Sequence, residues 1–313
     1  MTQKLLTVAM LAAAAALTAC AAPAPAPAMK AEPVVIAPPA TPSPWIAGNP
    51  QWAQPVAPFR VIGPIYYVGS AELASFLIRT NDGLILLDGG LPDNAPMIAR
   101  NIATLGFDLR RVRLLLNSHA HFDHSGGLAA LKAASGAELL AMEGDRSALE
   151  SGVYLGDEDN PRFGAPPVKV DRTIADGAIV RLGEVSMRAH LTPGHTRGCT
   201  SWAMRVREGA AEYEVLFFCS ATVAANRLAP EQYPGIVADY RRTFEITKDW
   251  RPDVFLGAHA TFFDMERKRQ NLLAGDPIAF VDPDTFPALR ARLAVDFEQR
   301  LAAQQTALDA RRK

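Results

Sequence analysis

The stretch NSHAHFDHSGG, residues 117–127, determines how this chain is organised. It places three histidines and one aspartate within six positions, although the whole sequence has only six histidines. The apolar residues 114–116 before it predict a short buried strand, and Gly126 and Gly127 open an expected helix. Neutral imidazoles and a carboxylate on such a loop are ligands that zinc prefers. The stretch therefore predicts a metal site.

Two ions sharing this loop are easier to accommodate than one, because adjacent residues cannot converge on a single ion without strain. In this arrangement His119 and His121 bind one ion, while Asp123 and His124 bind the other. The alternative is a polar surface loop or a cluster of core histidines. The concentration of half of all histidines in one loop favours the metal site.

The composition bounds the possible functions. A chain of 313 residues with 49% hydrophobic content can bury a large core and form one or two domains. Its formal net charge of -1 argues against a nucleic acid or an anionic membrane held by bulk electrostatics.

The N-terminus predicts export. Residues 5–17 form an apolar run of signal-peptide length that is too short to span a membrane comfortably. Residues 17–20, LTAC, resemble the lipobox of bacterial lipoproteins, which implies a signal peptide over 1–20, lipidation of Cys20 and an outer-membrane anchor. Cleavage after Ala21 is the alternative and would release a soluble periplasmic protein. Residues 21–44, rich in Ala and Pro, are expected to be an extended linker to a catalytic domain over 45–313.

Patterns of apolar residues and turn residues predict an α/β (α+β) protein with two β-then-α halves packed sheet against sheet. The expected strands are 59–62, 65–69, 74–80, 84–88, 113–117, 138–142, 179–182, 185–191, 199–206, 212–219 and 254–257. The expected helices are 94–105, 128–134, 143–149, 235–250 and 285–310. Residues 151–170 lack any periodicity and form a long loop, which is usually functional in a compact domain.

Three further polar residues follow expected strands. His195 lies on a tight turn, and His259 and Asp88 each end a strand. With the histidine loop they supply enough ligands for one three-histidine site and one Asp-His-His site. His190, the remaining histidine, lies within a strand and is expected to pack in the core or beside a ligand.

These residues resemble the metallo-β-lactamase superfamily. The His-x-His-x-Asp-His signature, the Pro-Gly-His turn and the last ligand of that family correspond to His119, His121, Asp123, His124, His195 and His259. The resemblance is most specific at residues 88–90, 118–127 and 193–198. It implies a four-layer αββα sandwich with the metal site at one edge of the two sheets. It also implies two zinc ions, the first held by His119, His121 and His195, and the second by Asp123, His124 and His259.

The strand end at residues 219–222, CSAT, separates subfamilies. Thioesterases, lactonases and phosphodiesterases of this family have an aspartate here that bridges both ions, and subclass-one lactamases have a cysteine ligand and lack the histidine after the aspartate. This chain has Ser220 and retains His124, which resembles class B β-lactamases of the third subclass. Residues 52–59 and 240–244 resemble that subclass as well. Cys219 is therefore not expected to be a ligand.

The implied activity is hydrolysis of the β-lactam amide bond of small-molecule antibiotics by a zinc-bound hydroxide. Asp123 would orient this nucleophile, Asp88 would accept an imidazole N–H from His119 or His121, and Ser220 and Thr222 would bind the substrate carboxylate. The chain is expected to be a monomer. The alternatives are a metallo-hydrolase of the same fold acting on a thioester, lactone or phosphodiester, and a non-catalytic zinc-binding envelope lipoprotein.

Two more expectations concern the surroundings of the site. Tyr154, Arg162 and Phe163 in the loop 151–170 are expected to border it, the alternative being a disordered surface loop. A hairpin folded symmetrically about Gly209 places Cys199 opposite Cys219, at about 4.5–5.5 Å between Cα atoms, which a disulfide accepts. The alternative is two buried free cysteines.

Overall fold

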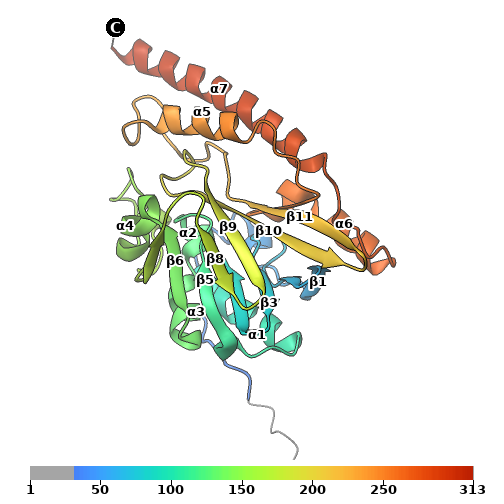
Figure 1. Ribbon diagram of the computed structural model, residues 1–313. Helices are drawn as coiled ribbons and strands as arrows, with labels where there is room; N and C mark the ends of the chain where they lie inside the picture. Colours follow the sequence, from blue (N-terminus) through green and yellow to red (C-terminus); the bar gives the residue numbers. More distant parts are fainter. Residues whose placement is uncertain (1–31, 313) are drawn as a thin grey trace, which may run out of the picture. The chain divides into compact units, whose positions relative to one another are not determined.

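Two β-sheets of the computed structural model, which describes residues 32–312, form the centre of the fold (Figure 1). The seven strands of the first sheet lie side by side in chain order: β1 (Phe59–Ile62), β2 (Ile65–Tyr67), β3 (Phe76–Thr80), β4 (Gly83–Leu87), β5 (Val112–Leu116), β6 (Glu138–Met142) and β7 (Arg172–Ile174). Neighbours from β1 to β4 are antiparallel, and those from β4 to β7 are parallel. The parallel half therefore brings several strand ends to one edge, as a site built on strand-end loops requires.

The second sheet has five strands, which also lie side by side in chain order. Across the sheet they are β12 (Val254–Gly257), β11 (Ala211–Phe218), β10 (Thr200–Glu208), β9 (Val185–Leu191) and β8 (Ile179–Leu182). All neighbours are antiparallel except β11 and β12, which are parallel.

The described part of the chain has seven α-helices and five short 3-10 helices. The α-helices are α1 (Ala95–Thr104), α2 (Phe122–Ser125), α3 (Leu128–Ser135), α4 (Glu143–Ser151), α5 (Ile236–Ile246), α6 (Met265–Leu273) and α7 (Thr285–Arg311). The 3-10 helices are η1 (Pro50–Trp52), η2 (Pro92–Asn94), η3 (Leu109–Arg111), η4 (Pro161–Phe163) and η5 (Ala260–Phe263). The strand β7 and the helices α2 and α6 were not expected from the sequence.

Alternation along the strands creates the four layers. Ile85 of β4 packs between the sheets in the same cluster as Trp202, whereas its neighbour Leu86 packs on the other side with Ile98 of α1 and Leu128 of α3. On the outer face of the second sheet, Phe286 of α7 contacts Phe218, with 5.0 Å between ring centroids. Helices therefore cover the outer face of each sheet, which confirms the expected αββα sandwich.

The hairpin between β10 and β11 has a different register from the expected one. Glu208 pairs with Ala211, so the turn contains two residues, with Gly209 at a φ of 60°, and is not centred on Gly209. Two-residue hairpin turns require positive φ near their start, which glycine supplies without steric cost. The expectation of a symmetric turn about Gly209 is therefore wrong by one residue.

The structure nevertheless contains the disulfide between Cys199 and Cys219, with a Cα–Cα distance of 5.8 Å. Both cysteines lie just outside the paired strands, since β10 begins at Thr200 and β11 ends at Phe218. The N–H of Cys219 donates to the hydroxyl of Ser201 at 3.1 Å, so the regular ladder has ended at this point. The bond thus forms next to the ladder, not between directly opposed residues of it.

The N-terminal expectations fall mostly on residues that the structure does not describe. The signal peptide 1–20 with Cys20 and the first part of the linker, residues 21–31, lie outside the described residues. From Pro33 onward the chain forms one compact unit, in which Val34 and Ile36 pack against the cluster around α1. Among residues 32–312, no helix is both long enough and apolar enough to cross a membrane.

Candidate metal centre

The histidine loop connects the end of β5 to α2, and its backbone is fixed by partners from three other segments. The N–H of Ser118 donates to Asp88 at 2.7 Å, and its carbonyl accepts from the N–H of Thr200 at 2.7 Å. The N–H of Ala120 donates to Asp145 at 3.0 Å. These bonds hold a short segment without regular structure in one conformation, so that its side chains converge.

Three buried imidazoles, His119, His121 and His195, form what we call the first set. The Nε2 atoms of His119 and His195 are 3.2 Å apart, and the three rings lie at centroid distances of 4.8, 4.6 and 4.4 Å. Two nitrogens about 2.0–2.1 Å from a tetrahedral zinc ion are roughly 3.3 Å apart. The first set therefore has the chemistry and the spacing of a metal site.

Asp123, His124 and His259 form the second set beside it. Oδ2 of Asp123 lies 3.3 Å from Nε2 of His124 and 3.6 Å from Nε2 of His259, and these two nitrogens are 3.3 Å apart. The ring of His119 is 4.4 Å from that of His124, so the two sets adjoin. The structure thus brings together all six ligand residues expected from the sequence, and each set fits one ion.

Burial controls the charges of these residues. It lowers the pKa of His119 and His121 well below the usual value and that of His195 to about 4. For Asp123, burial alone would raise the pKa, but the charge of His124 and its hydrogen bond hold it well below the usual range. For His124, burial is outweighed by Asp123, which raises its pKa. The first set therefore offers neutral imidazoles, and the second offers a carboxylate anion.

The outer nitrogens of the ligand histidines have several different partners. Nδ1 of His195 lies 2.7 Å from the carbonyl of Thr222, and Nδ1 of His119 lies 3.0 Å from the hydroxyl of Ser118. Nδ1 of His259 lies 3.3 Å from Oε1 of Glu72. Such partners orient a ring and fix its tautomer. Glu72 was not expected from the sequence, because nothing local in residues 71–74 relates it to a histidine far along the chain.

Asp88 faces a different histidine from the expected ones. Its Oδ1 accepts from Ser118 and Asn117, and its Oδ2 lies 4.0 Å from Nδ1 of His124, whereas the sequence predicted His119 or His121 as its partner. The end of β4 lies against the part of the loop that carries His124, because the N–H of Gly89 donates to the carbonyl of His124 at 2.8 Å. Burial raises the pKa of Asp88 to about 6, and its φ of 62° marks a strained strand end.

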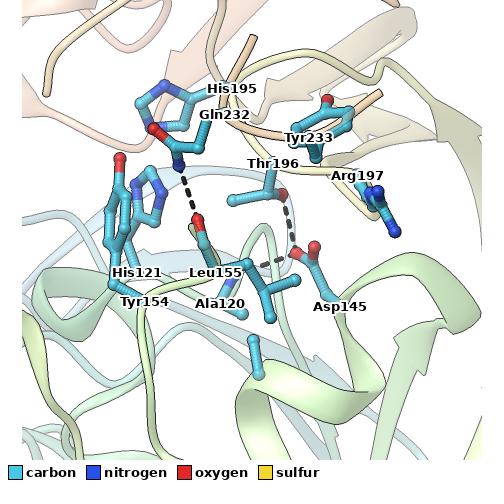
Figure 2. A pocket seen from close by; sticks show the side chains of 11 residues that line it. Ala120, His121, Asp145, Tyr154, Leu155, His195, Thr196, Arg197, Gln232 and Tyr233 are labelled. Carbon is cyan, nitrogen blue, oxygen red and sulfur yellow. Dashed lines mark hydrogen bonds between the residues drawn. The ribbon is translucent and has the colours of Figure 1, made fainter. Parts of the chain in front are cut away.

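Asp145, at the start of α4, links the two loops that carry the first set (Figure 2). Oδ2 accepts from the N–H of Ala120 at 3.0 Å and from the hydroxyl of Thr196 at 2.8 Å, and Oδ1 accepts from the N–H of Gly198 at 2.7 Å. A Cβ on Gly198 would lie 2.4 Å from the backbone N of Asp145, so only glycine permits this approach. Asp145 was not expected either, although its position just after a strand of the parallel half was a usable signal.

A cavity of 310 Å³ lies over the two sets, with aromatic side chains on its walls. It is lined by ligand residues and by Trp45, Trp52, Phe122, Tyr154, Phe163, Thr222, Ala224 and Ala225. Tyr154 and Phe163 confirm that the loop 151–170 borders the site. The guanidinium of Arg162 lies 4.9 Å from the ring of Trp45 and is not part of the lining. Thr222 reaches the cavity, whereas Ser220 is buried behind it.

The remaining histidine and the cysteines lie outside both sets. His190, on β9, packs against Trp250 at 5.1 Å between ring centroids. Cys199 and Cys219 are bonded to each other, so neither offers a thiolate.

Comparisons with known proteins agree with this geometry. The model of the metallo-β-lactamase superfamily matches residues 74–208. BJP-1, a subclass B3 metallo-β-lactamase of Bradyrhizobium japonicum, is 46% identical with a TM-score of 0.80, over 82% of this chain and 98% of that chain. LRA-12, a class B3 di-zinc metallo-β-lactamase from an Alaskan soil metagenome, is 31% identical with a TM-score of 0.75, over 81% and 97%.

A curated relative with a different activity matches a shorter stretch. The hydroxyacylglutathione hydrolase of Rhodospirillum rubrum is 31% identical over 107 residues. The match covers 34% of this chain and 34% of that relative's length. The solved structures, in contrast, are matched over nearly their whole length, with the same two-sheet architecture. The chain therefore belongs to the metallo-β-lactamase superfamily and, within it, is similar to the subclass B3 enzymes.

Proposed function

We propose that this protein is a dinuclear zinc hydrolase that opens the amide bond of β-lactams. The observation that carries the proposal is the composition of the second set. It contains His124 and a single carboxylate, Asp123, and the end of β11 supplies the neutral Ser220 where a bridging aspartate would stand in related thioesterases. The similarity to subclass B3 lactamases over nearly their entire length supports the same substrate class.

The residues present would hold the two ions and leave the cavity side of each open to a substrate. Zinc bound there would supply a Lewis acid for the lactam carbonyl and would lower the pKa of water from about 15.7 toward neutrality. The neutral imidazoles of the first set do not have to lose protons at pH 7 to bind a cation, since burial holds the pKa of each below its usual value.

The other residues of the cavity would position the substrate. The ionised Asp123, with a carboxylate oxygen 3.3 Å from Nε2 of His124, can accept a hydrogen bond from the attacking water and orient it. Thr222 lines the cavity, and its hydroxyl, which lies 3.2 Å from that of Ser220, can donate to the substrate carboxylate. The aromatic walls exclude bulk water, which strengthens these polar interactions.

The test compares two substrate classes in one assay series. We expect kcat/KM to be measurable on a chromogenic cephalosporin and on a penicillin and carbapenem panel, and to be lost when a chelator removes the metal. An acylglutathione thioester, assayed separately, represents the substrate class of the alternative hydrolase. Hydrolysis of the thioester without any β-lactam hydrolysis would assign the chain to the alternative hydrolase, and metal binding without either activity would make it a non-catalytic zinc protein.

Replacing Asp123 by Asn should weaken the second site and leave the first one filled. An amide is a neutral and poorer zinc ligand than a carboxylate, and here it would lie within 3.6 Å of the two nitrogens of the second set. Elemental analysis after dialysis against limiting zinc should give about one ion per chain, compared with two for the wild type. An unchanged metal content together with unchanged turnover would contradict the dinuclear arrangement.

Replacing Phe163 by Ala should change the ranking of substrates without changing metal content. The ring of Phe163 lies 5.3 Å from that of Trp45 and 5.0 Å from that of Tyr154 on the cavity wall. Loss of one aromatic wall removes up to about 1.5–3 kcal/mol of apolar contact, so KM for substrates with apolar side chains should rise by about 10-fold to 100-fold. Phe107→Ala is the control, because Phe107 packs on Tyr66 in the cluster around α1. Equal rankings for all three proteins would contradict a role for the loop.

A further inference from the structure

Asn226, on the segment between β11 and α5, is buried beside the first set with all its hydrogen-bonding capacity used. Its Nδ2 donates to the carbonyl of His195 and to the hydroxyl of Tyr240, both at 2.9 Å. Its Oδ1 accepts from the hydroxyl of Tyr154 at 2.5 Å and from Nε2 of Gln232 at 3.3 Å. An amide has two donor hydrogens and two acceptor lone pairs, so the side chain is fully satisfied.

These bonds determine how His195 is held. Asn226 binds its backbone carbonyl, while the ring Nδ1 lies 2.7 Å from the carbonyl of Thr222. Because a carbonyl only accepts, Nδ1 carries the proton, and the free lone pair of Nε2 points toward His119. The same Thr222 carbonyl accepts from Tyr240, which in turn accepts from Asn226. Asn226 therefore fixes both the backbone of His195 and the residue that orients its ring.

The side-chain oxygen of Asn226 is connected, through Tyr154, to His121, a second ligand of the first set. The ring of Tyr154 stacks on that of His121, with centroids 4.5 Å apart and an interplanar angle of 17°. Figure 2 shows the two rings side by side at the left of the pocket. The hydroxyl of Tyr154 donates a hydrogen bond to Asn226, which in turn donates to the carbonyl of His195. The stacked rings of Tyr154 and His121 are therefore held in one position relative to His195.

The backbone of Asn226 is itself held from outside the site. Gln304 of α7 donates from Nε2 to the carbonyl of Asn226 at 3.1 Å and accepts the N–H of Leu228 at 2.6 Å. The C-terminal helix thus attaches to the segment that contains Asn226, and Figure 1 shows this helix running along α5.

We propose that Asn226 is a positioning residue that sets the geometry of the first metal site, holding His195 directly and His121 through Tyr154. This role rests on the proposed metal binding but not on the identity of the substrate. Loss of such an outer partner typically costs about 10-fold to 100-fold in metal affinity or activity. The competing explanation is a buried asparagine that contributes only to stability.

The experiment uses Asn226→Asp, which keeps an acceptor for Tyr154 and replaces the donor to His195 by a carboxylate oxygen. Tyr154→Phe keeps the ring stack and removes only the hydroxyl. Asn101→Asp is the control, because Asn101 is also buried and donates to the carbonyl of Val68 at 2.9 Å, within the cluster around α1. For each protein we would measure Co²⁺ affinity by competition with a chromophoric chelator, the visible spectrum of the one-cobalt form, and the melting temperature of the metal-free chain.

We expect Asn226→Asp to lower cobalt affinity about 10-fold to 100-fold and to alter the cobalt spectrum. Tyr154→Phe should alter the spectrum in the same direction to a smaller extent, while Asn101→Asp lowers the melting temperature alone. The role is overturned if Asn226→Asp and Tyr154→Phe both keep the wild-type affinity and spectrum. If Asn226→Asp does not fold, Tyr154→Phe alone decides by the same criterion. A wild-type chain that binds no cobalt or zinc would instead overturn the proposed metal site itself.

Discussion

His195→Ala is expected to abolish hydrolysis and to empty the first set. The substitution removes one of three nitrogen donors, and the remaining pair, His119 and His121, cannot complete a tetrahedral site with a single open position. Because loss of an outer partner already costs up to about 100-fold, loss of a direct ligand should reduce kcat/KM by more than about 100-fold. Steady-state kinetics and elemental analysis of the same preparation measure both effects.

His190→Ala is the matched control for this prediction. His190 is the only histidine outside the two sets in the sequence, and it packs on Trp250 at the outer face of the second sheet. Its variant should keep wild-type metal content and turnover. A His195→Ala protein that kept both would show that His195 is not a ligand, and the first set would then have to be redefined around His119 and His121.

The ligand residues were predictable because they are encoded locally. Three histidines and an aspartate in six positions after an apolar run are informative without any knowledge of the fold. His195 and His259 were found because each follows a strand, and loops that follow strands collect at one edge of the sheets. The order of strands and helices predicted two β-then-α halves packed sheet against sheet, and the family resemblance implied the αββα layers. In the structure, successive residues such as Ile85 and Leu86 face different clusters on the two sides of their sheet.

The surroundings of the ligands were not predictable in the same way. The pairing of Glu72 with His259 depends on how the two halves of the chain dock. The pairing of Asp88 with His124 depends on how the segments that follow the neighbouring strands β4 and β5 lie against each other, and no local pattern records either arrangement. The predicted register of the hairpin between β10 and β11 was wrong for a simpler reason. A glycine followed by a small residue fits a two-residue turn or a three-residue turn, and only the cross-strand packing of Trp202 opposite Phe217 selects between them.

Asp145→Ala is expected to be the most damaging substitution outside the ligands. It leaves the buried N–H groups of Ala120 and Gly198 without their acceptor, and the half-buried hydroxyl of Thr196 loses its partner as well. Each buried unsatisfied group costs about 1–3 kcal/mol, so the metal-free protein should lose at least about 2 kcal/mol of unfolding free energy. Because the two loops that carry the first set share this carboxylate, metal affinity should fall as well. Urea unfolding in the presence of a chelator measures the first effect separately from the second.

Asp276→Ala is the control variant for this prediction. Asp276 also accepts a backbone N–H, that of Ile278 at 3.0 Å, but it is exposed, so water replaces the lost acceptor. Its substitution should change the unfolding free energy by less than about 0.5 kcal/mol. Equal losses in the two variants would mean that Asp145 is an ordinary turn residue. A large loss in Asp145→Ala with unchanged metal affinity would mean that the histidine loops hold their shape without it, by their bonds to Asp88 and Thr200 alone.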